Sequence, residues 1–478
     1  MAADFAFASV AELGRALRAH NVTATDLAQL FCDRLEQLGT RYGAVVTVTR
    51  GRALTEAAQA DKEIRAGKWR GPLHGIPYGV KDLLTAAGYP TTWGAAPYEQ
   101  QLIDQDATVV AKLKAAGAVL CAKLAMVELA GGMGYNHANA SFTGPGRSPW
   151  NADYWSGGSS SGPGAAVAAG LVPFAIGSET SGSILTPAAY CGVTGLRPTY
   201  GRVSRHGAMA LSWTMDKLGP LARTAGDCAL ILATIAGPDP LDPSAVTQHF
   251  SVPAETARRR RKLKIGVLKG ATDRIQAEVA KNFTDAMGVL HDVIDVVPDV
   301  TLPDLPWGVV GGTIIAAEGS SAFDDLMDSG RVAWLTAAED RIGGYGALAI
   351  PARDYLRALR VRRLMGKAFD EFIKQFDAIA VPSRNSVASP VDKSFREAWP
   401  DVTGGASLIG PANVVGAPAI SLPNGFGVAG LPTGISFTTR TFDEAVLVEL
   451  GRVYQERTDW HKRTPVIAQD AASAPSTR

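Results

Sequence analysis

The segment from Gly157 to Ser183 reads GGSSSGPGAAVAAGLVPFAIGSETSGS. Its two ends are clusters of glycine and serine, a composition that is typical of flexible linkers. Between them lie a small-residue helical stretch, 165–169, and an apolar run of strand length, 171–176. Apolar runs of this kind must be buried, and a flexible linker would not be embedded in a core. We therefore expect the two clusters to lie at a site inside the fold.

Strand and helix patterns alternate on both sides of this segment. The expected strands are 76–80, 118–124, 263–268 and 376–381, and the expected helices are most of 1–45, 106–116 and 353–372. Thr23 to Asp26 offers a capping box for the helix that follows it. This alternation predicts an α/β fold, in which helices cover both faces of a layered sheet.

The composition fits a large globular enzyme with no strong charge. Of 478 residues, 46% are hydrophobic and 19% charged, and 47 Lys and Arg balance 46 Asp and Glu. Neither a nucleic acid nor an anionic membrane is therefore expected as a partner. The one basic run, Arg258 to Lys262, is interpreted as part of a solvated linker. The tail 470–478 is expected to be disordered.

The cysteines, the N-terminal segment and the most apolar stretch indicate the cellular compartment of the protein. Four scattered cysteines form no CxxC pair, which suits a reducing compartment. The N-terminus has no basic segment before an apolar core, so it does not resemble a signal peptide. The most apolar stretch, 164–177, is too short to span a bilayer. The sequence predicts a cytoplasmic protein.

The glycine and serine clusters suit a serine nucleophile. Glycines let backbone N–H groups approach a reacting atom, and successive N–H groups in a tight turn can hold an oxyanion. The nucleophile also needs a base. None of the seven histidines lies in a motif, whereas Lys81 closes an apolar run in which desolvation would depress its pKa.

One alternative is the G-x-S-x-G elbow of α/β-hydrolases, which the sequence matches formally with Ser160 as nucleophile. That elbow follows a buried strand directly. Residues 151–157 contain Asp153 and are expected to form a loop, which argues against the elbow.

Several motifs in order resemble the amidase-signature family of serine amidases. They are Gly-Ile-Pro-x-x-x-Lys-Asp ending at Asp82, Gly-Gly-Ser-Ser from Gly157, Gly-Ser-Ile from Gly182, and the stretches 191–204 and 416–423. The resemblance runs from about Ser9 to Pro465, with local similarity to the A subunit of glutamyl-tRNA amidotransferase. It implies one catalytic domain over 1–469, with a signature core at about 70–225 and a variable substrate-side region at about 300–353. It also implies a large twisted mixed β-sheet with helices on both faces.

The resemblance assigns roles by position. Lys81 falls on the family's lysine, Ser159 on the bridging serine that follows a cis peptide bond, and Ser183 on the nucleophile. The backbone N–H groups of Thr180, Ser181, Gly182 and Ser183 would form the oxyanion hole. Lys81 would accept a proton through Ser159 while Ser183 attacks the carbonyl, giving an acyl-enzyme. No metal or organic cofactor is implied.

Two residues depart from the family pattern beside the expected nucleophile. Ser181 stands where a glycine is usual, and Leu185 stands where an arginine is usual. These changes bear on the shape of the oxyanion loop and leave the serine and lysine positions intact.

The substrate is expected to be a small aryl or apolar amide, or a related carbamate or ester. The residues expected at the pocket are Gly131, Gly132, Met133, Tyr135, Phe142 and Trp307. The alternative is the glutamine-hydrolysing component of a tRNA-dependent amidotransferase. Glutamine-using relatives carry an acidic residue where our alignment places Ala406. Arg362 either holds the glutamine carboxylate or lies on a helix surface. A homodimer is compatible with the sequence.

Overall fold

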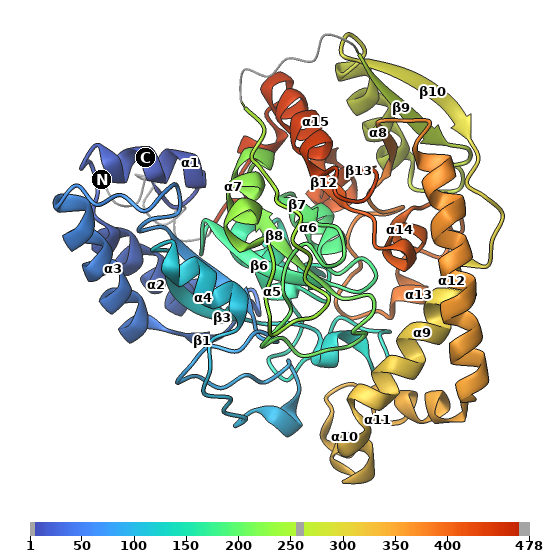
Figure 1. Cartoon of the computed structure of the whole chain (residues 1–478), viewed down its shortest axis with the longest axis horizontal. Coiled ribbons are helices and arrows are strands. Elements are labelled where there is room, and N and C mark those ends of the chain that lie inside the picture. The colour runs from blue at the N-terminus through green and yellow to red at the C-terminus, as the bar shows by residue number, and fades with distance from the viewer. Residues whose placement is uncertain (1–4, 255–261, 468–478) are drawn as a thin grey trace, which may run out of the picture.

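The computed structural model describes residues 5–254 and 262–467 (Figure 1). Eleven of its strands form one mixed sheet in the order β1-β3-β2-β6-β8-β7-β12-β13-β11-β9-β10. These strands are β1 (Val45–Val48), β2 (Pro77–Lys81), β3 (Val119–Leu124), β6 (Phe174–Glu179), β7 (Thr194–Arg197), β8 (Lys217–Ala222), β9 (Leu263–Leu268), β10 (Ile294–Val300), β11 (Ala378–Pro382), β12 (Ala419–Phe426) and β13 (Pro432–Thr438). The α/β fold class predicted from the sequence is confirmed.

Fifteen α-helices are present among the described residues, and Figure 1 shows them arranged around the sheet. They are α1 (Val10–Arg18), α2 (Ala24–Leu38), α3 (Arg50–Arg65), α4 (Thr108–Ala115), α5 (Ser161–Ala168), α6 (Leu185–Cys191), α7 (Ala225–Ile235), α8 (Ala277–Val289), α9 (Trp307–Ala322), α10 (Asp324–Asp328), α11 (Asp340–Gly343), α12 (Ala352–Ile373), α13 (Phe395–Ala398), α14 (Ile409–Val415) and α15 (Glu444–Arg457). The capping box predicted at Thr23 and Asp26 is formed at the start of α2.

Strand β12 shows how helices cover both faces of the sheet. Successive side chains of a strand point to opposite faces. Ile420 points toward α15, where its Cδ1 lies 3.4 Å from the position of a Cβ on Gly451. Ser421 points the other way, with its hydroxyl 2.8 Å from that of Ser383, on the side of Ala189 in α6. The sheet is therefore buried from both sides.

The strands at the centre of the site are parallel and fully buried. β2 pairs in parallel with both β3 and β6, and every residue of the three strands is buried. Parallel strands covered on both faces are continuous apolar runs, which is why the runs 76–80, 118–124 and 171–176 were recognisable in the sequence. Along the sheet order β6-β8-β7-β12-β13-β11 all neighbouring strands pair antiparallel, and the last three strands, β11, β9 and β10, are parallel.

The structure corrects one local prediction. Asn151–Trp155 was expected to be a loop and instead forms β5, which pairs with β4 (Arg147–Ser148) in a separate two-stranded sheet. β5 is only partly buried and is not a strand of the main sheet. The chain after it is therefore not the elbow of an α/β-hydrolase, although the reason differs from the one expected.

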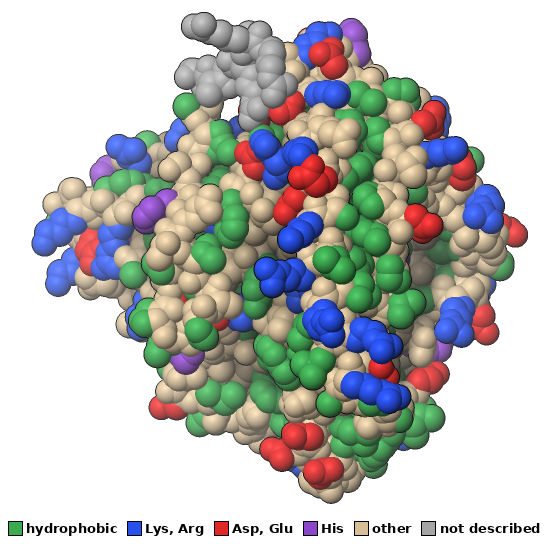
Figure 2. Space-filling model, turned by 45° about the vertical axis from the view of Figure 1, so that its right-hand side comes forward, with side chains coloured by type: hydrophobic (Ala, Val, Ile, Leu, Met, Phe, Trp, Pro, Cys, Tyr) green, Lys and Arg blue, Asp and Glu red, His purple; other side chains and the backbone are tan. Residues whose placement is uncertain are grey.

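Two further predictions concern charge and the chain ends. In Figure 2 basic and acidic side chains are intermixed on the visible face, as the balanced charge suggests. Most of the basic run 258–262, and the tail 470–478, lie outside the described residues.

The four cysteines are buried and form no disulfide. Within the described ranges, no helix is long and apolar enough to cross a membrane.

Candidate active site

The carboxyl ends of β2 and β6 bring together the lysine and the second serine cluster. The two strands are parallel neighbours, with Gly79 opposite Ala175 and Val80 opposite Ile176. Lys81 is the last residue of β2, so its side chain emerges beside the end of β6. Its amine donates to the hydroxyl of Ser178 at 2.9 Å.

The first serine cluster meets the same amine. Lys81 Nζ lies 2.7 Å from Ser159 Oγ, and both side chains are fully buried. The peptide bond between Gly158 and Ser159 is cis. Helix α5 begins at Ser161, so the cluster is the entry to a buried helix and not a linker.

Burial dominates the electrostatics of Lys81. Desolvation lowers its pKa to about 7, while the charges of Asp216 and Glu179 act in the opposite direction. A lysine amine in water is almost wholly protonated at neutral pH. At the end of β2 it is neutral in a large fraction of molecules, and a neutral amine has a lone pair that can accept a proton.

Ser183 lies on the tight turn between β6 and α6. Gly182 has φ +101°, a conformation that side chains rarely adopt. The backbone carbonyl of Ser183 accepts a bond from the N–H of Ser160 at 3.3 Å, which ties the two serine clusters together. Ser183 is 7% exposed, whereas Ser181 is exposed. The side chain of Ser181, which stands where the family usually has a glycine, therefore points into solvent.

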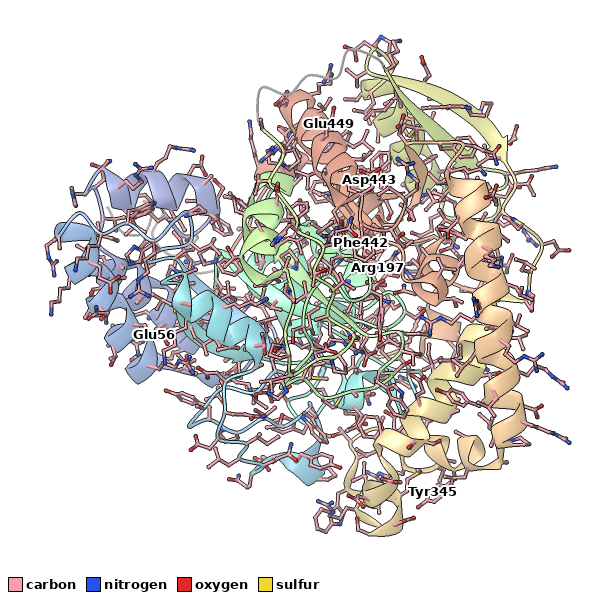
Figure 3. All side chains as sticks on the ribbon, in the orientation of Figure 1. Glu56, Arg197, Tyr345, Phe442, Asp443 and Glu449 are labelled. Atoms are coloured by element: carbon pink, nitrogen blue, oxygen red, sulfur yellow. The ribbon has the colours of Figure 1, made fainter. Side chains whose placement is uncertain are left out.

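The carboxylate of Glu179 holds the backbone of the turn that contains Ser183. One of its carboxylate oxygens accepts the N–H groups of Ile184 at 2.9 Å and Leu185 at 3.0 Å. The other accepts from Arg197 at 2.7 Å and Asn413 at 2.8 Å. All these groups are buried, and Figure 3 labels Arg197 near the centre of the molecule. The carboxylate fixes the backbone immediately after Ser183.

Thr180 is held in a similar way on the other side of the turn. Its hydroxyl donates to Asp216 at 2.6 Å. The second oxygen of Asp216 accepts the N–H groups of Leu211 and Ser212. These bonds fix the loop 211–216 against the segment expected to form the oxyanion hole.

A cavity of about 170 Å³ opens beside this segment. Ser178 and Thr180 contribute to its wall, which therefore reaches the immediate neighbours of Lys81 and of the Ser183 turn. Most of the remaining wall is apolar, and it includes Leu83, Ala130, Met209, Leu211, Trp213 and Leu218. Asp216, His206 and the ion pair of Arg205 with Asp242 complete it on the polar side. Of the six residues expected at the pocket, none lines this cavity.

Those six residues have other surroundings. Gly132 packs closely on Phe323 and Leu211, and Gly131 on the ring of Tyr135. Tyr135 in turn lies against Gly158, because a Cβ there would be 2.8 Å from its hydroxyl. Met133 is buried against Gly344, and Phe142 is half-buried, with its N–H bonded to the carbonyl of Gly94. Trp307 packs edge-on against Phe369 in the core between α9 and α12. Tyr135 is thus the one of the six that the described contacts bring to the Gly157–Ser159 turn.

The structure also places the three residues on which the alternative functions depend: Ser160, Arg362 and Ala406. The hydroxyl of Ser160 is bonded to the backbone of Ser178, donating to its carbonyl and accepting from its N–H. Arg362 donates to Val414 and Thr214, so its guanidinium is used inside the fold. Ala406 bonds through its N–H to Gly270 and packs at the edge of an apolar cluster.

The sequence reasoning did not assign functions to the residues that support this site. Ser178 contacts the lysine amine, and Glu179 and Asp216 hold the two sides of the turn. Residues 178–180 form one extended segment, in which successive side chains point to opposite faces. The sequence could therefore have predicted that Ser178 and Thr180 face one side and Glu179 the other. Asn413 is distant in sequence, and nothing in its own segment reveals its contact with Glu179.

The chain was compared with known proteins. A family model described as Amidase matches residues 26–448. Two relatives, each named as the A subunit of glutamyl-tRNA(Gln) amidotransferase, cover 96% of this chain and 98% of their own. The one from Roseiflexus sp. (strain RS-1) is 36% identical over 483 residues, and the one from Halorhodospira halophila (strain DSM 244 / SL1) is 37% identical over 482 residues.

Solved structures are similar over almost the whole chain. One belongs to a vestigial protein complex that bears on the origins of an s-triazine catabolic enzyme, with a TM-score of 0.84 and 29% identity over 94% of this chain and 98% of that one. Another is the native peptide amidase from Stenotrophomonas maltophilia, with a TM-score of 0.82 and 30% identity over 95% of this chain and 97% of that one.

Proposed function

This chain belongs to the amidase-signature family of hydrolases acting on amide bonds, and from that premise we propose that it cleaves a small amide through Lys81, Ser159 and Ser183. The observation that carries the proposal is the buried contact of 2.7 Å between Lys81 Nζ and Ser159 Oγ. A buried amine of depressed pKa beside a serine hydroxyl is a base with a proton path toward a nucleophile.

The proposed reaction starts with neutral Lys81. The amine accepts the proton of Ser159, which accepts the proton of Ser183 as the Ser183 oxygen attacks the substrate carbonyl. The resulting oxyanion accepts bonds from the backbone N–H groups of 180–183. The same relay then returns a proton to the leaving nitrogen, so that the C–N bond breaks and an ester to Ser183 remains. Water attacks this ester, and the acid leaves as the serine regains its proton.

The substrate that we propose has an aryl or apolar group. This is supported by the mainly apolar wall of the 170 Å³ cavity beside Ser178 and Thr180, in which Arg205 is already paired with Asp242. Apolar walls favour apolar groups because burial removes them from water. The same attack would cleave a carbamate or an ester of similar shape.

A second candidate is the glutamine-hydrolysing component of an amidotransferase. The relatives of that name, 36–37% identical over 96% of the chain, favour it. Two local observations favour the independent amidase. Ala406 offers no carboxylate for a substrate amine, and the guanidinium of Arg362 is already bonded to Val414 and Thr214.

The test is amine or ammonia release from an anilide, an aliphatic amide, a carbamate, an ester and glutamine. Ser183→Ala and Ser160→Ala are assayed beside the wild type. Turnover of an anilide or simple amide that is lost in Ser183→Ala supports the proposal. Turnover of glutamine alone favours the second candidate, and turnover that survives in Ser183→Ala contradicts the assigned nucleophile.

A further inference from the structure

The loop that follows β11 is held firmly beside the first serine cluster. At its start the N–H of Ser383 donates to the carbonyl of Gly434 at 2.8 Å, and further on the carbonyl of Asn385 accepts a backbone N–H at 3.0 Å. Near its end the carbonyl of Ser389 accepts the N–H of Trp155 at 2.9 Å. Trp155 ends β5, and one residue, Ser156, separates it from the Gly157–Ser159 turn. The loop 383–391 is thus an ordered wall next to that turn.

This loop presents one arginine, Arg384, that has no acidic ion-pair partner among the described residues. Arg384 is exposed to solvent, and it forms no ion pair with any residue of 5–254 or 262–467. Its guanidinium carbon lies 6.0 Å from the centre of the Tyr190 ring. The residue as a whole is exposed, but its guanidinium is desolvated beside Tyr190. The charge of Tyr190 and a side-chain hydrogen bond with it raise the pKa of Arg384 more than desolvation lowers it, and Tyr135 and Glu179 act in the same direction as Tyr190. The side chain therefore stays cationic at every pH at which the protein is folded.

Glu179 does not neutralise this arginine. Its two carboxylate oxygens already accept four bonds, from Arg197, Asn413 and the backbone N–H groups of Ile184 and Leu185. Arg197 balances its charge at 2.7 Å. Arg384 is therefore an additional positive charge, and an anion that approaches it meets no competing carboxylate on the loop.

The residues around Arg384 connect it to both serine loops. Tyr190 lies in α6, about 7.5 Å along the helix from its first residue, Leu185, which follows the Ser183 turn, at 1.5 Å per residue. Tyr135 is 36% exposed, and its hydroxyl lies against Gly158 beside the bridging serine. The guanidinium is thus beside Tyr190 of the helix that follows the Ser183 turn, and Tyr135 and Glu179 also act on its charge. The residue as a whole is exposed, so that a substrate can reach it.

We propose that Arg384 binds a carboxylate on the amide substrate and thereby selects anionic amides. The planar guanidinium presents paired N–H donors that match the two oxygens of a carboxylate. The rigid loop limits the entropy lost when the side chain is fixed on binding. The apolar cavity beside Thr180 would take the aryl or alkyl part while Arg384 holds the charged end. This inference rests on the proposed amidase function.

The test uses two matched pairs of anilides. In the first pair the acyl group ends in a carboxylate or a methyl group (succinanilate and butyranilide). In the second pair the carboxylate or the methyl group is on the aryl ring (4-acetamidobenzoate and 4-methylacetanilide). Values of kcat/KM are measured for the wild type, Arg384→Gln, Arg384→Lys and the control Arg353→Gln, whose side chain is 82% exposed on α12.

We expect the wild type to prefer the carboxylated member of at least one pair by about 10- to 100-fold, the range of a hydrogen bond to a charged group. Arg384→Gln should abolish this preference, mainly through KM. Arg384→Lys should retain part of it, and Arg353→Gln all of it.

The outcomes separate this inference from the proposed function. Equal rates within both pairs, with turnover dependent on Ser183, would overturn the role of Arg384 and leave the amidase intact. A preference that survives in Arg384→Gln would also overturn it. Hydrolysis of none of the four anilides would count against the proposed aryl amidase itself.

Discussion

The amine of Lys81 lies 2.7 Å from the hydroxyl oxygen of Ser159, and neither side chain is exposed to solvent. The lysine comes from the end of β2 and the serine from the turn before α5, 78 residues apart. Burial lowers the pKa of Lys81 to about 7. The consequences of this pair for rate and for stability can be measured separately.

The first prediction concerns the pH dependence of the rate. Because only neutral Lys81 can accept a proton, kcat/KM for an amide should rise about tenfold per pH unit below pH 7 and level off above it. In Ser178→Ala the amine loses an acceptor that favours its charged form, so the rise should move to lower pH. Rates recorded from pH 5.5 to 9 check both points. A rate that is flat down to pH 5.5 would exclude Lys81 as the base.

The second prediction concerns stability. The folded pKa of Lys81 is depressed from 10.5 to about 7, so the unfolded chain binds more protons between these values and stability rises with pH across this window. Lys81→Met removes the buried amine. It should raise the free energy of unfolding by about 1–4 kcal/mol at pH 7, and by less at pH 10, while activity is lost. Urea unfolding at the two pH values measures this difference. A loss of stability at pH 7 would contradict the account.

The third prediction concerns the carboxylate of Glu179, which holds the backbone after the proposed nucleophile Ser183. Glu179→Gln leaves Arg197 buried without its charge partner, which should cost about 3–5 kcal/mol of stability and most of kcat. Asn413→Ala removes a single bond to the same carboxylate and should cost about 1–3 kcal/mol. Unfolding and kinetics of the two variants give the ranking. Equal effects would show that the ion pair is not what supports the turn.

The fourth prediction concerns a buried acid outside the site. Asp340 at the start of α11 is 1% exposed. Burial and the neighbouring Glu128 raise its pKa to about 8. The folded chain therefore keeps a proton that the unfolded chain loses, and stability falls as pH rises from about 4 to 8. Asp340→Asn mimics the protonated acid.

This variant should therefore gain about 1–3 kcal/mol more at pH 8 than at pH 5, relative to the wild type. Thermal unfolding at the two pH values measures the difference. A gain that is the same at both would mean that Asp340 is not the titrating group.

The parallel centre of the fold was predictable because its strands are buried on both faces. The run before Lys81 became β2, and Leu263–Leu268 became β9 with the predicted bounds. The antiparallel half was less visible. The strand Lys217–Ala222 contains a lysine, a glycine and a proline, which interrupt its apolar pattern. The strand Thr194–Arg197 has only four residues, so neither strand shows a clear periodicity. Their pairing depends on contacts distant in sequence.

The candidate site divides in the same way. The serine and lysine motifs are local, so sequence reasoning found them. Trp307 was expected at the pocket and packs in the core on Phe369, because an aromatic side chain suits either place equally well. Arg384 follows a strand in an ordinary polar stretch. Only the folded chain places it beside Tyr190, with no ion pair to an acid within 5–254 or 262–467.

The most direct test of the central claim is to trap the acyl-enzyme and locate it. The wild type, Ser183→Ala, Ser160→Ala and Lys81→Met are mixed with a slowly hydrolysed aryl ester, quenched with acid, digested and analysed by mass spectrometry. We predict an acyl group on Ser183 in the wild type, none on this peptide in Ser183→Ala, and strongly slowed acylation in Lys81→Met. An acyl group on Ser159 or Ser160, or turnover that persists in Ser183→Ala, would contradict the account.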